Sequence, residues 1–371
     1  MSKLISQGGY GCVYHPGFDA NNSKKTDEET VVKLQHKSAV SKNEIKISKI
    51  IVSIPHYTFY FAPILKTEPI KIGEIDSKLI KSCKPIAHNM GEEFVLMTVP
   101  YVNKENYFDS IINIDNADTR SVLTQYIDSY TFLLSSIDIL IKQKIIHYDI
   151  KDDNIVYNRL TRNPIIIDFG ISILIDDLNS KTWSQYFYVF APEYYIWCLE
   201  IHFICYLVQI KDILDIEDIT MVCNNYINSC PIFSYFSPEF KEQYINGAIQ
   251  FYRQYVDMDK DKVIKDLLET WDTWDNYSLS ILNLRVLSYL FNNSYSVNDT
   301  IIYLIELYLQ NIHFDGKRRL SVQETKDSYK KIYNQETIID NIYSLLTTIK
   351  PKRIHVKSKI KEDKLIRSSI N

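Results

Sequence analysis

Two short apolar runs in the middle of the chain are separated by a polar turn, and this pattern predicts a β-hairpin. Residues 155–157 (Ile-Val-Tyr) and 165–167 (Ile-Ile-Ile) are too short for helices and rich in β-branched side chains, which favour strands. Asn154 precedes the first run, and Asp168 follows the second. Hairpin pairing would therefore bring Asn154 and Asp168 close together. Amide and carboxylate oxygens are hard ligands of the kind that Mg²⁺ takes when it bridges phosphates.

Apolar residues with a period near 3.6 predict helices in much of the remaining chain. The longest such pattern covers residues 117–144, directly before the hairpin, and a shorter one covers residues 41–52. Further helices are expected over residues 201–210, 212–223, 238–255, 303–309 and 323–333.

Residues 30–34 (Thr-Val-Val-Lys-Leu) alternate as a strand does and turn a single lysine inward. A buried lysine without an anion is costly, so Lys33 is expected to face phosphates and a carboxylate. Glu44, on the predicted helix 41–52, is the natural partner; the alternative is that Glu44 is a solvated surface residue. Residues 59–65 and 93–99 are predicted to be the next strands, with a loop over residues 66–92 between them.

A glycine-rich turn begins the chain. Gly8 and Gly11 would let backbone N–H groups approach phosphate oxygens with no side chain in the way. Taken alone, such a turn is equally well explained as an ordinary hairpin. The polar residues 19–29 that follow are expected to form a loop.

Composition limits the class of protein. With 371 residues, 46% hydrophobic and 13% aromatic, the chain is expected to fold with a sizeable core. A net charge of −4 gives no argument for nucleic-acid binding. No apolar run reaches transmembrane length, and the N-terminus lacks a signal-peptide core. The six cysteines contain no C-x-x-C pair, which indicates neither a zinc site nor a dense disulfide framework and favours a reducing, cytoplasmic compartment.

The polar segments around the hairpin match a known pair of motifs. Residues 147–154 (His-Tyr-Asp-Ile-Lys-Asp-Asp-Asn) and 168–170 (Asp-Phe-Gly) resemble the catalytic loop H-R-D-x-x-x-x-N and the metal loop D-F-G of protein kinases. A lone D-x-x-x-x-N would be weak, since Asp and Asn are common in surface turns. Two ordered motifs at the expected separation are much more specific.

The resemblance implies a role for each matched residue. Asp149 would accept or orient the hydroxyl of the substrate, and Lys151 would steady the γ-phosphate of ATP. Asn154 and Asp168 would hold Mg²⁺ or Mn²⁺. Lysine at position 151 is similar to the Ser/Thr-specific form of the family.

The glycine-rich turn resembles the family's G-x-G-x-x-G-x-V loop, with Ser6 in place of the first glycine. Ser6, Gly8, Gly9, Gly11 and Val13 are then expected to cover ATP.

Lys33 matches the lysine of the V-A-I-K strand, with Glu44 as its partner, although their separation is shorter than is usual in the family. Met97 and Tyr101, in the segment Met-Thr-Val-Pro-Tyr, match the hinge by position alone and would read the adenine edge through backbone groups. Pro100 lacks an N–H, so neighbouring residues would have to donate.

Two later segments resemble the large lobe of the family. Asp275 stands where D-x-W-S-x-G places an acceptor for backbone N–H groups of the catalytic loop. Arg319, in Asp-Gly-Lys-Arg-Arg-Leu-Ser, resembles the arginine of D-P-x-x-R-x-S, which pairs with a glutamate. Glu193, in a literal A-P-E, and Glu200 both remain candidates for that glutamate. Small-molecule phosphotransferases of the aminoglycoside type would not be expected to carry both features.

One departure bears on regulation. Tyr148 stands where most regulated kinases carry an arginine that receives the activation-loop phosphate. Activity is therefore expected not to depend on phosphorylation of residues 171–190. His147 is interpreted as a structural imidazole and not as a general base.

The resemblance implies an α+β, bilobal protein-kinase-like fold. Residues 1–100 would form the ATP-covering lobe, a small antiparallel sheet with one helix. Residues 101–345 would form a larger, mainly helical lobe with a helical insertion at about 201–270, and residues 346–371 a basic tail.

The implied function is that of a Ser/Thr protein kinase using ATP and Mg²⁺, and a monomer is expected. The partners expected are ATP and a protein substrate, without nucleic acid. Similarity to kinases of large DNA viruses would place the protein in host cytoplasm or virion. The alternative is a pseudokinase or scaffold that uses the same fold to bind partners.

Overall fold

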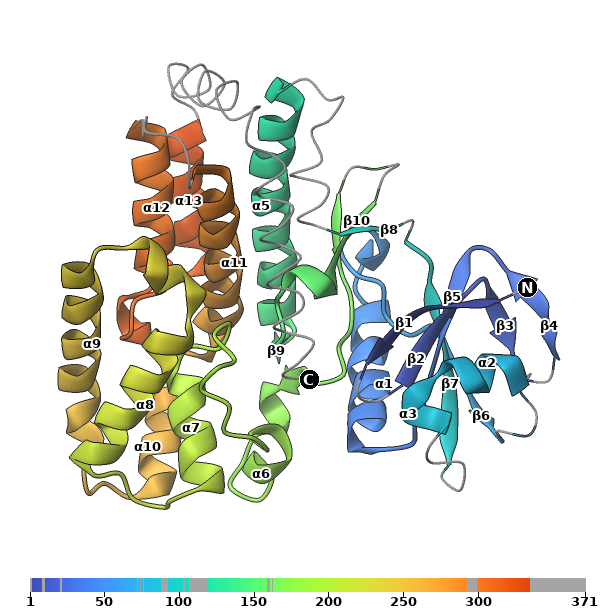
Figure 1. Cartoon of the computed structure of the whole chain (residues 1–371), viewed down its shortest axis with the longest axis horizontal. Helices are drawn as coiled ribbons and strands as arrows, with labels where there is room; N and C mark the ends of the chain where they lie inside the picture. Colours follow the sequence, from blue (N-terminus) through green and yellow to red (C-terminus); the bar gives the residue numbers. More distant parts are fainter. Residues whose placement is uncertain are drawn as a thin grey trace. The chain divides into compact units, whose positions relative to one another are not determined.

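The computed structural model describes two compact units (Figure 1). The N-terminal unit comprises the described residues within 2–106 together with those of Asp153–Ser172, and the C-terminal unit those within 119–152 and 173–333. The described residues are 2–8, 11–20, 22–71, 73, 75, 77–87, 93–102, 104–106, 119–158, 161, 163–291 and 299–333. The hairpin region therefore belongs with the N-terminal unit, whereas the predicted division assigned it to the larger lobe.

A five-stranded antiparallel sheet is the centre of the N-terminal unit. Its strands, in spatial order, are β1 (Lys3–Gly8), β2 (Gly11–His15), β5 (Thr30–His36), β7 (Phe94–Pro100) and β6 (Lys66–Ile70). Lys33 of β5 lies opposite Val13 on one side and Met97 on the other. The overall class is mixed α+β, as predicted.

Strand alternation gives this sheet two apolar faces. Val32, Leu34, Phe94 and Leu96 join a buried core that also includes residues from the helical turns α2 (Ser77–Ser82) and α3 (Lys84–Ala87). The intervening residues Val95 and Met97 pack on the other face.

Helix α1 (Ala39–Val52) confirms the prediction of a helix after β5. Ser38 and Ser41 form a reciprocal capping box that satisfies backbone N–H groups at its start. Glu44, Ile47 and Ile51, spaced by three and four residues, lie on its buried face.

Two local predictions in this unit are wrong. Residues 59–65 form no strand: a 3₁₀ turn covers Tyr57–Phe59, Pro63 lacks a ladder donor, and Phe61 makes only an isolated bridge to Ile166. The strand is β6, inside the predicted loop. Residues 19–29 also contain structure, because β4 (Asn22–Asp27) pairs with β3 (Gly17–Asp19).

The predicted hairpin is confirmed. Strands β10 (Ile155–Asn158) and β11 (Pro164–Ile166) pair antiparallel, and β8 (Lys104–Asn106) adds a third strand beside β10. The pair continues beyond the strands, since the Ile167 N–H donates to the Asn154 carbonyl at 2.9 Å.

The described part of the C-terminal unit is mainly helical (Figure 1). Its helices are α5 (Thr119–Lys142), α6 (Trp183–Tyr186), α7 (Leu199–Gln209), α8 (Ile216–Ser229), α9 (Pro238–Tyr252), α10 (Lys260–Leu268), α11 (Trp274–Phe291), α12 (Asp299–Asn311) and α13 (Val322–Tyr333). Helix α5 packs against α11 and α13, and α12 packs against the same two helices. A two-stranded ladder joins β9 (Ile145–Ile146) to β12 (Ile173–Leu174).

The region predicted as a helical insertion is helical. Asp215, Ser237 and Asp259 cap α8, α9 and α10 by accepting hydrogen bonds from backbone N–H groups in the first turn of each. These capping residues determine where each of the three helices begins. The predicted basic tail, 346–371, lies outside the described residues.

Two of the six cysteines form a disulfide, and the other four are free. Cys12 of β2 and Cys83, between α2 and α3, form a disulfide, while Cys198, Cys205, Cys223 and Cys230 are free and buried. One disulfide is no dense framework, but the spacing of the cysteines gave no reason to expect it.

None of the described helices combines the length and apolar character that crossing a membrane requires.

Candidate active site

Lys33 is the centre of an ion cluster in the N-terminal unit. Its Nζ lies 2.9 Å from both carboxylate oxygens of Glu44 and 3.0 Å from Oδ1 of Asp168. Burial alone would lower the pKa of Lys33, but the two carboxylates outweigh it and raise that pKa, so the ammonium stays charged. Glu44 is 4% exposed, which excludes the alternative of a solvated surface residue.

The local fold explains why these groups meet despite the short interval between Lys33 and Glu44. Strand β5 leads into α1 after only two residues, and the capped helix turns Glu44 to its buried side. The amide of Asn43 donates to the carbonyls of Gly170 and Ser172, at 3.2 and 2.7 Å. Helix α1 is therefore tied directly to the segment that carries Asp168.

Asn154 and Asp168 flank the end of the hairpin. Asn154 is buried, whereas the Asp168 side chain is 46% exposed. Asp168 has a left-handed backbone, with φ of 64°. Non-glycine residues in this conformation often mark functional sites.

Among the described residues, no group of three His, Cys, Asp or Glu side chains has the arrangement of a metal site. Mg²⁺ is commonly held by one or two protein oxygens together with phosphates and water, so a separate cluster is not required. The carboxylate of Asp168 and the amide of Asn154 are of the chemical type that such an ion takes. That they hold a metal stays a prediction.

The strands on either side of the glycine-rich turn, β1 and β2, pair antiparallel, with Gly8 opposite Gly11. A Cβ on Gly11 would lie 2.2 Å from the Leu34 carbonyl oxygen, so packing against β5 already requires glycine there. At Gly8 a Cβ would meet nothing within 4 Å. Ser6 lies opposite Val13 beside a register shift in β1, and Gly9 lies outside the described residues.

The predicted hinge begins inside β7. Met97 is fully buried between β5 and β6. The Tyr101 N–H donates to the Glu29 carbonyl at 2.8 Å, and its ring stacks on His15. The Tyr101 N–H is therefore already used within the unit.

In the C-terminal unit, Asp149 and Lys151 form a compact cluster with Tyr194. Lys151 Nζ lies 3.0 Å from Asp149 Oδ2 and also donates to the Tyr194 hydroxyl at 3.0 Å. The Tyr194 hydroxyl donates to Asp149 Oδ1. The spacing of the motif identified Asp149 and Lys151 as candidate site residues. It did not identify Tyr194, which lies 45 positions from Asp149 along the chain.

Asp275 holds the loop that carries Asp149 by accepting two backbone hydrogen bonds. The N–H groups of His147 and Tyr148 donate to the two oxygens of Asp275, at 2.6 and 2.9 Å. This confirms Asp275 as an acceptor for the loop. His147 is fully buried, and its Nδ1 accepts the Asp149 N–H at 3.3 Å, as a structural imidazole would.

Tyr148 is an anchor of the same loop. Its backbone is left-handed, with φ of 70°, which is unusual for a bulky side chain. Its ring is buried and packs on Trp197 at 4.6 Å, and its carbonyl accepts the Trp197 Nε1–H at 2.8 Å. Tyr148, noted above as a departure from the kinase pattern, thus makes aromatic contacts at this position.

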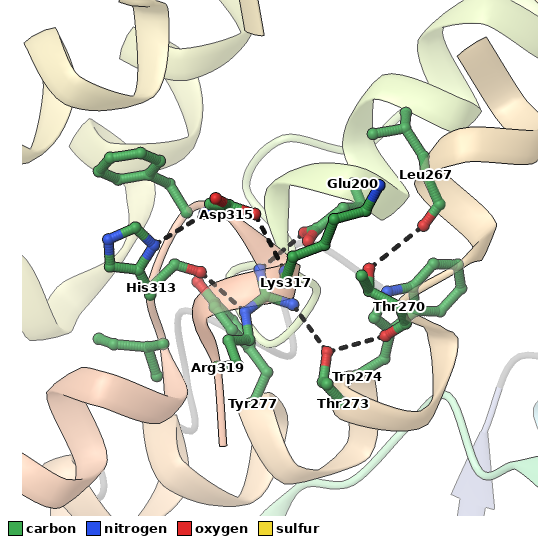
Figure 2. Close-up of polar contacts among 12 residues, drawn as sticks. Glu200, Leu267, Thr270, Thr273, Trp274, Tyr277, His313, Asp315, Lys317 and Arg319 are labelled. Atoms are coloured by element: carbon green, nitrogen blue, oxygen red, sulfur yellow. Dashed lines mark hydrogen bonds and ion pairs between the residues drawn. The ribbon is translucent and has the colours of Figure 1, made fainter. Parts of the chain in front are cut away.

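Arg319 pairs with Glu200 (Figure 2). Of the two candidate glutamates, Glu200 is therefore the partner, and Glu193 is not. Its NH2 lies 2.7 Å from Glu200 Oε2, and both side chains are at most 3% exposed. Arg319 also donates to the His313 carbonyl and to Thr273 Oγ1, and its guanidinium lies over the ring of Tyr277. Glu193 is exposed.

Comparison of the chain with models of known protein families found no match, and a search of curated proteins found none either.

Proposed function

We propose that this chain is a Ser/Thr protein kinase of the bilobal eukaryotic type, which transfers the γ-phosphoryl group of ATP to protein hydroxyls. One observation carries the proposal: Lys33 contacts Glu44 and Asp168 at once, with Asp168 at the end of the hairpin that Asn154 begins. Because desolvation offsets most of the attraction in a buried ion cluster, a charged lysine held between two carboxylates is better explained by a functional role than by stability.

The proposed roles follow from the chemistry of the side chains. Lys33 would bind phosphate oxygens, with Glu44 fixing its position. Asp149 would accept the hydroxyl proton of the protein acceptor, and Lys151 would stabilise charge on the transferred group. Bound at Asn154 and Asp168, Mg²⁺ would supply charge neutralisation for the phosphates.

The test is ATP-dependent labelling of a generic basic protein by the purified full chain. Asp149→Ala and Asp168→Ala should each abolish labelling. Asp176→Ala is the matched control, because Asp176 is 62% exposed and pairs with a surface lysine. Labelling that survives in both Asp149→Ala and Asp168→Ala would refute the proposal.

A pseudokinase is the second candidate, and one observation favours it. Both oxygens of Asp149 already contact side chains of the same unit, Tyr194 and Lys151. A pseudokinase would show saturable ATP binding, lost in Lys33→Met, without transfer to any protein.

A further inference from the structure

The hydroxyl of Tyr194 has the two partners that the proposed mechanism assigns to an acceptor alcohol. It donates to a carboxylate oxygen of Asp149, and it accepts from the ammonium of Lys151. Under the proposed function, these are the proton acceptor and the cation of the transfer step. The hydroxyl of a protein substrate would make the same two contacts.

Tyr194 is held in this place by its own segment. Its N–H donates to the Ala191 carbonyl at 2.9 Å, which closes a turn, and its ring packs edge-on against Trp197 at 4.9 Å. Trp197 is bonded in turn to the loop that carries Asp149. A backbone hydrogen bond and ring packing therefore position the hydroxyl.

Burial and the charge of Asp149 hold the pKa of Tyr194 well above its usual range. The phenol thus keeps its proton at neutral pH. The phenol hydroxyl must lose this proton when it reacts, and it already donates a hydrogen bond to Asp149, the proposed proton acceptor.

We propose that Tyr194 is a self-acceptor, phosphorylated within its own chain by the Asp149 site. The inference rests on the proposed kinase function. Because Tyr194 is already held against the proposed proton acceptor, a tyrosine can react here even if free substrates must be Ser or Thr.

In the transfer, the phenol oxygen forms a bond to the γ-phosphorus of ATP while the bond from that phosphorus to the β,γ-bridging oxygen breaks. ADP leaves with the electron pair, and the phenol proton passes to Asp149. The phosphorylated oxygen has no proton left to donate, so its hydrogen bond to Asp149 is lost. The added charge of about −1.5 to −2 also repels the carboxylate. Each chain is therefore expected to phosphorylate its own Tyr194 once, after which the residue leaves Asp149.

The neighbouring Tyr195 is a matched control. Its hydroxyl accepts a hydrogen bond from the Arg285 guanidinium, whereas the hydroxyl of Tyr194 donates to the carboxylate of Asp149. Both tyrosines lie in the same segment and are half-buried.

The experiment is to incubate the full chain with MgATP alone and to locate phosphate by mass spectrometry. Phosphate is expected on Tyr194 and not on Tyr195, at a first-order rate that does not change with protein concentration. It should be lost in Asp149→Asn and retained in Tyr195→Phe.

An unmodified Tyr194 in a preparation that labels an added basic protein would overturn this inference and leave the kinase function standing. A rate that rises with protein concentration would also overturn it, since that indicates transfer between chains. If neither Tyr194 nor the added protein is labelled, the kinase function fails, and the self-acceptor role fails with it.

Discussion

Replacing Arg319 with methionine should destabilise the C-terminal unit without acting directly on chemistry. The guanidinium is fully buried and makes three polar contacts, to Glu200 at 2.7 Å, to the His313 carbonyl at 2.7 Å and to Thr273 at 3.2 Å. Methionine fills much of the same volume, so the main effect is electrostatic. Glu200 would be left charged in a buried site with no cation.

The cost of that uncompensated charge is about 3–5 kcal/mol. This is a large part of the roughly 5–15 kcal/mol that stabilises a typical domain. Glu200→Gln also leaves a buried charge, that of Arg319, without its counter-ion, but it should cost less than Arg319→Met because the amide oxygen still accepts from the guanidinium. Glu200→Leu combined with Arg319→Met should cost less than the sum of the two single changes, since no unpaired charge remains.

Urea unfolding followed by tryptophan fluorescence measures this selectively, because all four tryptophans, at 183, 197, 271 and 274, lie in the C-terminal unit. Arg318→Met is the matched control: the exposed neighbour should change the free energy of unfolding by less than about 0.5 kcal/mol. A loss below about 1 kcal/mol for Arg319→Met, or equal losses for Arg318 and Arg319, would refute the reasoning.

Three further predictions test other features. Thr182→Ala with Ser184→Ala should leave labelling of a basic protein intact, because the Thr182 hydroxyl only closes its own turn, donating to the Asp177 carbonyl at 2.7 Å; loss of labelling would contradict this. Gly316→Ala should cost about 1–3 kcal/mol in urea unfolding, since a Cβ there would lie 2.5 Å from an oxygen of the buried ion pair, whereas Gly73→Ala, with open space around it, should not. Burial lowers the pKa of His202 to about 3, so between pH 6.5 and 3 the unfolded chain binds a proton that the folded chain does not. The free energy of unfolding should therefore decrease as the pH is lowered through this range, by up to about 1.4 kcal/mol per pH unit. His202→Leu should flatten this slope, and an unchanged slope would exclude His202 as its source.

Local patterns in the sequence determined the elements that carry the candidate site. The two β-branched runs at 155–157 and 165–167 are strands because their side chains suit a pleated, buried surface, and the turn between them makes them antiparallel. The single lysine in an apolar strand required an anion, and Glu44 was the nearest on a helical face. These inferences rest on neighbours within a few residues or on adjacent elements.

Local patterns were misleading where burial had a different origin. The run at 59–65 makes only an isolated bridge, from Phe61 to Ile166, and packing buries its middle residues Phe61, Ala62 and Ile64. The strand lies instead at Lys66–Ile70, whose alternation is weak. Gly11 matched a phosphate-binding motif, yet contact with β5 alone requires glycine there. Composition and periodicity do not distinguish these causes.

Only the tertiary structure decided which distant groups meet. Glu193 sits in a literal motif, yet Glu200 is the residue that α7 buries against Arg319. The approach of Tyr194 to Asp149 and the disulfide between Cys12 and Cys83 likewise had no signal in spacing. Such pairs join residues tens to more than a hundred positions apart, and which pairs form depends on how whole elements pack, which a periodic pattern along the chain does not encode.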